Sequence, residues 1–147
     1  MSEQDNIRIV QEALEAWNKH DPARFVALLD EKHVIESDTI PAPMAGREVG
    51  RQFMQIYVGA FPDLRLDNEQ ILGSGDFVVA RWTATGTHRG ELMGIAPTNR
   101  RATTHGCTVY EVRNGRITHE WIYGTPAISC DSSVSCPRPN ELTEPLS

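Results

Sequence analysis

Residues 101–123 read RATTHGCTVYEVRNGRITHEWIY, and this segment is the clearest indication of the fold in the sequence. Two runs rich in β-branched and aromatic residues flank the pair Asn114 and Gly115. An Asn-Gly pair between such runs is a strong signal for a tight β-hairpin. The pattern therefore predicts two antiparallel strands, over residues 101–112 and 116–123.

The sequence before this hairpin has the same two-residue period. Residues 77–88 are rich in Val, Thr and Trp, as strands are, and a further strand is predicted to begin at residue 64 and end by residue 72. The Gly-Ser-Gly-Asp segment between these two strands is a turn. Residues 89–99 contain two glycines and a proline, which indicates a loop. Together these signals predict an antiparallel meander.

The first part of the chain has helical periodicity instead. Apolar residues recur at helical spacing over residues 6–19, and Asp21-Pro22 is typical of the start of a second helix. A short β-like stretch at residues 33–36 precedes a proline-rich loop, and a third helix is predicted over residues 47–60. Helices followed by an antiparallel meander indicate an α+β fold, with the helices packed on one face of a curved sheet. The open end of such a sheet is a natural place for one ligand pocket.

Length, charge and cysteine content narrow the class of protein. A chain of 147 residues fits one domain, and its net charge of −6 disfavours nucleic acid as a partner. The first residues lack the basic and apolar segments of a secretory signal, and no apolar run is long enough to span a membrane. We therefore expect a cytoplasmic protein without a membrane partner. The spacing of its three cysteines and its histidines predicts no metal site.

The last residues have a different composition. From Gly124 onward the sequence is polar, rich in Ser and Pro, and without periodicity. We therefore predict a folded domain over residues 1–125 and a polar tail over residues 126–147. The tail contains Cys130 and Cys136, which we expect to stay reduced in the cytoplasm.

Several motifs, in order and correctly spaced, carry a resemblance to a known family. They are EALEAWN at residues 12–18, AFPDL at 60–64, GDFVVARW at 75–82, GTHRG at 86–90, MGIAPTN at 93–99 and NGRITHEW at 114–121. This set resembles the SnoaL-like polyketide cyclases of the nuclear-transport-factor-two superfamily, over roughly the first 125 residues. The resemblance implies a cone-shaped α+β barrel around one pocket. It also implies a homodimer that pairs through the outer face of the sheet.

The resemblance leaves the reaction open, because the family includes cyclases, hydroxylases, epoxide hydrolases, isomerases and proteins without known activity. Its cyclases place an aspartate in a Trp-x-x-x-Asp pattern, and here Trp121 is followed by Thr125 in that position. A threonine cannot act as the base of an aldol reaction near neutral pH. Strand alternation would put His119 and Tyr123 on the same face as Thr125.

Histidine is therefore the predicted replacement for the missing acid/base group. The candidates are His88, His105 and His119, with Tyr123 or Thr125 orienting the substrate. Each histidine also has a structural interpretation, such as bracing a turn, and Glu36 and Glu120 are interpreted as solvated. The residues expected to contact a substrate are Trp17, Glu36, Met44, Phe53, Tyr57, Trp82, Trp121 and Thr125.

Three functions follow from these features. The first is a cofactor-independent enzyme that cyclises or isomerises a small apolar carbonyl compound by proton transfer. The second is a binding domain that kept the pocket and lost the base, which Thr125 favours. The third is an epoxide hydrolase or hydratase. Family members with that activity use an Asp-Arg-Asp arrangement, and in this sequence only its arginine can be assigned, to Arg81.

Overall fold

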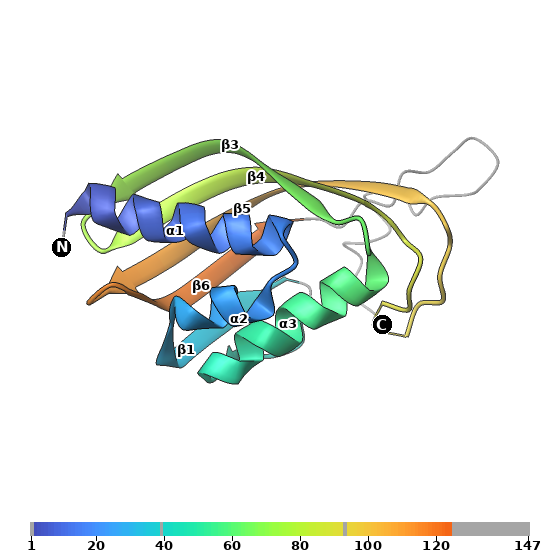
Figure 1. Ribbon diagram of the computed structural model, residues 1–147, viewed down its shortest axis with the longest axis horizontal. Coiled ribbons are helices and arrows are strands. Elements are labelled where there is room, and N and C mark those ends of the chain that lie inside the picture. Colours follow the sequence, from blue (N-terminus) through green and yellow to red (C-terminus); the bar gives the residue numbers. More distant parts are fainter. Residues whose placement is uncertain (1, 39, 93, 125–147) are drawn as a thin grey trace, which may run out of the picture.

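The computed structural model describes residues 2–38, 40–92 and 94–124. Within these residues three helices and six strands follow one another (Figure 1). In order they are α1 Glu3–Asn18, α2 Pro22–Ala27, β1 Leu29–Ser37, β2 Met44–Ala45, α3 Arg47–Ala60, β3 Arg65–Ser74, β4 Phe77–Thr87, β5 Arg101–Arg113 and β6 Arg116–Gly124. The predicted tail and Thr125 lie outside the described residues.

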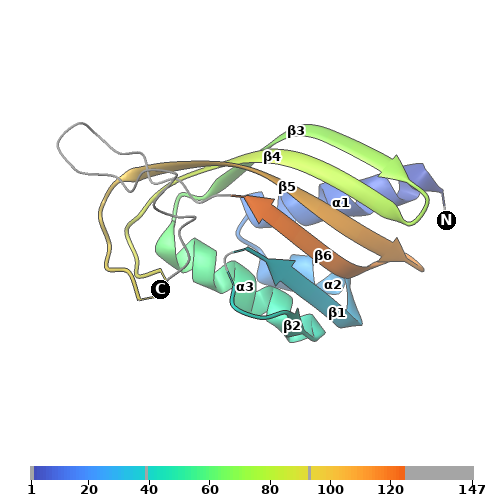
Figure 2. The same ribbon diagram turned by 180° about the vertical axis from the view of Figure 1, so that it is seen from behind.

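The six strands form one curled sheet in the order β2-β1-β6-β5-β4-β3. All neighbouring strands are antiparallel except β1 and β6, which are parallel. The sheet does not close on itself, and the three helices lie together on one of its faces (Figures 1 and 2). This α+β arrangement agrees with the predicted cone-shaped fold, with an open sheet in place of a closed barrel.

Local sequence signals account for most element boundaries. The Asp21 side chain accepts a hydrogen bond from the Arg24 amide and so caps α2, as predicted. Helix α3 has the predicted bounds. Asn114 and Gly115 both have positive φ, at 52° and 76°, which a two-residue hairpin turn requires.

Several boundaries differ from the sequence prediction: α1 begins at Glu3 instead of residue 6, and β3 continues to Ser74, past the predicted end at residue 72. The first strand begins at Leu29, earlier than the predicted residue 33. The short strand β2 forms inside the segment expected to be a loop, because Met44 and Ala45 pair with Ile35 and Val34 of β1. That pairing is a tertiary contact and leaves no periodic signal in so short a segment.

The main core lies between the helices and the sheet. Val10 and Leu14 of α1 pack against sheet residues that include Val78 and Ile117, and all four are at most 2% exposed. None of the helices in the described part of the chain is long and apolar enough to cross a membrane.

Candidate functional site

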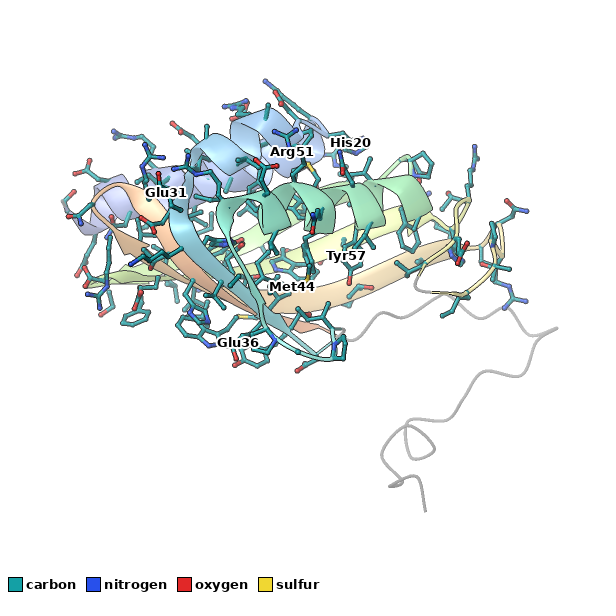
Figure 3. All side chains as sticks on the ribbon, turned by 90° about the horizontal axis from the view of Figure 1, so that it is seen from below. His20, Glu31, Glu36, Met44, Arg51 and Tyr57 are labelled. Atoms are coloured by element: carbon teal, nitrogen blue, oxygen red, sulfur yellow. The ribbon has the colours of Figure 1, made fainter. Side chains whose placement is uncertain are left out.

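A cavity of about 280 Å³ lies between the helices and the sheet. Aromatic side chains form much of its wall: Trp17 from α1, Phe53 and Tyr57 from α3, and Trp82 and Tyr110 from the sheet. Figure 3 shows Tyr57 extending from α3 toward the sheet, whereas Arg51 of the same helix points away from it. A mainly apolar cavity with a few polar groups is typical of a small-molecule site.

Glycine at position 106 makes room for the indole of Trp82. A Cβ atom at Gly106 would lie 2.4 Å from the Trp82 ring, closer than real side chains approach. The indole Nε1 donates a hydrogen bond of 2.9 Å to Oγ1 of Thr108, which also lines the cavity. Trp82 is therefore held in one orientation, with its ring on the cavity wall.

A carboxylate and an imidazole meet at this wall. Glu120 lines the cavity, and its Oε2 lies 2.8 Å from Nε2 of His33. Both side chains are buried, with 3% and 0% of their residues exposed. His33 contacts Glu120 but is not among the lining residues, so Glu120 lies between His33 and the cavity. A buried histidine–carboxylate pair can hold and transfer a proton.

Tyr110 lies beside Glu120 on the neighbouring strand. The two residues are directly paired across β5 and β6, and both line the cavity. Burial raises the pKa of Tyr110 well above its ordinary value, and the negative charge of Glu120 raises it further. A hydrogen bond with Thr108 acts in the opposite direction. Tyr110 therefore keeps its proton and offers a neutral hydroxyl donor to a bound ligand.

A β-bulge in β6 puts Glu120 on the cavity side. Val112 and Glu111 of β5 pair with Ile117 and His119 of β6, so Thr118 is an extra residue between them. An extra residue shifts the alternation of all side chains that follow it. Ile117 and Glu120 are therefore both buried, although they lie three positions apart.

This bulge makes the predicted placement of two site residues wrong. His119 and Tyr123 do not line the cavity, and Tyr123 is 51% exposed. Simple alternation had placed both on the cavity face. The ring of His119 stacks on Trp121 at 3.8 Å, and its Nε2 lies 2.6 Å from Oε2 of Glu36. Figure 3 shows Glu36 on the side of the sheet away from the helices.

The interpretation of Glu120 as a solvated side chain also needs correction. Glu120 is buried in the cavity wall and not solvated, because the bulge turns it inward. Glu36 is half-buried and held by His119. Neither Glu36 nor Trp121, both expected to contact a substrate, is among the residues that line the cavity.

The other two predicted histidines lie outside the cavity lining. His88 is fully buried, its Nδ1 lies 3.0 Å from Oγ1 of Thr98, and its ring packs against Phe61. His88 directly follows β4 and Thr98 lies near the start of β5, so this contact links the two ends of the loop between these strands. His105 is exposed, with its Nδ1 3.0 Å from Oγ1 of Thr83.

The structure brings together only part of the predicted binding set. Trp17, Phe53, Tyr57 and Trp82 line the cavity, and Met44 does not. His33 and Glu120 were missed as a pair, because no motif contains His33 and the motif that contains Glu120 does not indicate which way its side chain points. The only available signal was that each lies in a strand beside apolar residues.

The site contains no metal-binding arrangement in the described ranges. No group of three or more His, Cys, Asp or Glu side chains is placed there to hold a metal ion. Arg81, the arginine assigned to the Asp-Arg-Asp arrangement of an epoxide hydrolase, is exposed and does not line the cavity. The described lining also contains no aspartate.

Comparisons with known proteins agree with this fold. The model of the SnoaL-like polyketide cyclase family matches residues 7–125. No curated protein matches the chain.

Solved structures with this architecture come from several bacteria. AclR from Streptomyces galilaeus, provisionally described as a hydroxylase, is 27% identical, with a TM-score of 0.74, over 84% of this chain and 77% of its own. IdmH from Streptomyces antibioticus, provisionally described as a polyketide cyclase, is 28% identical, with a TM-score of 0.70, over 81% of this chain and 91% of its own. An LEH-like epoxide hydrolase from M. tuberculosis shares the fold at 21% identity and a TM-score of 0.66, over 83% of this chain and 84% of its own.

Proposed function

We propose that this chain, which belongs to the SnoaL-like polyketide cyclase family, is an acid/base enzyme for a largely apolar carbonyl compound. The proposed reaction is proton removal next to the carbonyl group, leading to cyclisation or isomerisation without a cofactor. The single observation that carries the proposal is the Glu120 carboxylate, which lines an apolar cavity and is held from behind by His33.

Glu120 would act as the base in this reaction. Its Oε2 is fixed by His33, and its Oε1 has no hydrogen-bond partner among the described residues. Oε1 would take the proton from the carbon next to the substrate carbonyl, leaving an enolate. In the following step the protonated carboxyl would return a proton to the product. His33 does not line the cavity, so we assign it a positioning role.

Tyr110 would stabilise the enolate oxygen. Its hydroxyl keeps its proton, since burial and Glu120 hold its pKa well above the ordinary value. A donor that is already in place needs no reorganisation when negative charge develops on the substrate. The aromatic walls would position the substrate and exclude water.

A rival function is a binding domain without catalysis. The position of the family aspartate is occupied by Thr125, which favours it. The buried carboxylate in the cavity wall favours the enzyme instead, because an unused buried charge carries a desolvation cost. An Asp-Arg-Asp epoxide hydrolase receives no support from the described lining.

Proton exchange on a small ketone separates the enzyme from the binding domain. We expect the protein to accelerate exchange of the acidic CH₂ protons of 2-tetralone in D₂O, followed by NMR. Acetate buffer at the same carboxylate concentration is the control for simple base catalysis. Saturable exchange well above this control supports the proposal. If the ketone binds saturably but its protons exchange no faster than in the acetate control, the protein is a binding domain.

We also propose that the protein forms a homodimer through the outer face of the sheet. One row of apolar side chains crosses four neighbouring strands there: Leu72, Val79, Val109 and Trp121 are successive register partners. Leu72 is 58% exposed, and Phe77 beside this row is 42% exposed. A contiguous apolar patch of this kind is typical of an interaction surface.

Replacing Leu72 with arginine should separate the dimer into monomers, because two like charges would face an apolar row across the interface. Native mass spectrometry and sedimentation velocity measure the change in mass. Gln11→Arg, at an exposed position of α1, adds the same single positive charge away from this face. A wild-type protein that is monomeric at all concentrations tested would remove the homodimer proposal.

A further inference from the structure

The charges around the cavity are unbalanced. Among the described residues that line it, Glu120 is the only acidic side chain, and no Lys, Arg or His is present. Its one hydrogen-bond partner among the described residues is His33, whose Nδ1 is buried with no hydrogen-bond partner among those same residues. A protonated imidazole would leave a charged N–H group buried and unpaired at that atom, which is costly. A neutral His33 that donates from Nε2 avoids this cost and leaves the carboxylate charge without a full counter-charge.

The aromatic walls favour the same sign of ligand charge. The rings of Trp17 and Phe53 lie 6.0 Å apart, and those of Phe53 and Tyr57 lie 5.0 Å apart, so three rings adjoin on the helical side. Trp82 and Tyr110 lie on the sheet side of the same cavity. The face of an aromatic ring carries negative potential and attracts an ammonium group. A cation placed in this cavity would be stabilised by the rings and by the carboxylate together.

We infer that the cavity selects ligands that combine a flat apolar body with a protonated or quaternary amine. This names the substrate class of the proposed enzyme, as an aromatic carbonyl compound that bears a basic nitrogen, and to that extent rests on the proposed function. The ammonium group lies against the ring faces, and Oε1 of Glu120 is left for the reacting carbon. A carboxylate or phosphate ligand finds no basic side chain in the described lining and is repelled by Glu120.

Three probes of one shape test this selection on the full chain. They are 2-naphthylmethylamine, 2-naphthylmethanol and 2-naphthoate, which are cationic, neutral and anionic at pH 7. Isothermal titration calorimetry should show the amine binding at least tenfold more tightly than the alcohol, with the naphthoate weakest. Equal or tighter binding of the alcohol or the naphthoate would overturn the inference.

Two variants assign the preference to the buried carboxylate. Glu120→Gln keeps the shape of the side chain and should reduce the amine preference to less than about threefold, with binding of the alcohol unchanged. Glu36→Gln removes the same charge from the opposite side of the sheet and should keep the full preference. If Glu120→Gln fails to fold, as judged by circular dichroism, the comparison of the three probes on the wild-type protein still decides.

The outcomes for selectivity and for catalysis are independent. A clear amine preference without accelerated exchange of 2-tetralone would support the inferred ligand class and contradict the proposed enzyme activity. Accelerated exchange with no preference among the three probes would support the proposed enzyme activity and contradict the inferred ligand class.

Discussion

Replacing Glu120 with glutamine should lower the rate of proton exchange on 2-tetralone by about 10²–10⁴-fold, the usual contribution of a general base. Glutamine has nearly the same shape and can still accept a hydrogen bond from Nε2 of His33, but it cannot take a proton from carbon. The loss should therefore appear in kcat, with little change in KM. Exchange rates measured by NMR over a range of ketone concentrations separate the two constants.

The outer face of the sheet supplies the control for this experiment. Glu36→Gln removes a carboxylate that contacts His119 and lies outside the cavity lining, so exchange should change by less than about twofold. If Glu120→Gln retained exchange within about threefold of the wild-type rate, the base would have to be another group. Tyr110→Phe and Tyr57→Phe, at the other titratable side chains of the described lining, would then be the next variants to measure.

Replacing His33 with leucine should lower the free energy of unfolding by about 1.5–3 kcal/mol, because the buried Glu120 carboxylate would lose the hydrogen bond that His33 donates. A loss of this size is a large fraction of the 5–15 kcal/mol typical of folded domains. Urea denaturation followed by circular dichroism measures it. His105→Leu, at an exposed position of β5, should change stability by less than about 0.5 kcal/mol.

A double variant distinguishes a lost partner from a lost packing contact. In His33→Leu with Glu120→Met both polar groups are gone, and two apolar side chains of similar size fill the space. Much of the stability should return, since replacing both members of a buried pair is often neutral. The interaction energy of this double-mutant cycle should therefore be large. Additive losses in the double variant would contradict the assignment of a coupled pair.

Local sequence patterns were enough to predict most of the fold. Helix α3, the Asp21 cap of α2 and the Asn114-Gly115 turn depend on neighbours within a few residues, and the sequence shows those neighbours directly. The change from a helical to a two-residue period then predicted the α+β class. The apolar and aromatic character of the cavity could also be anticipated, because Trp17, Phe53, Tyr57 and Trp82 are large apolar residues in periodic segments.

The chemistry of the site could not be predicted in the same way. His33 and Glu120 are 87 positions apart, and they meet only because β1 and β6 lie side by side as parallel strands. Glu120 faces the cavity, and His119 faces away, because one extra residue at Thr118 shifts the alternation of β6.

Periodicity and turn signals therefore predicted which segments are helices and strands and that they enclose an apolar pocket. Which polar side chain faces that pocket depends instead on how the strands pair in the folded protein. A bulge and a parallel strand pairing are set by contacts between distant segments, whereas periodicity reports only on contacts along one segment.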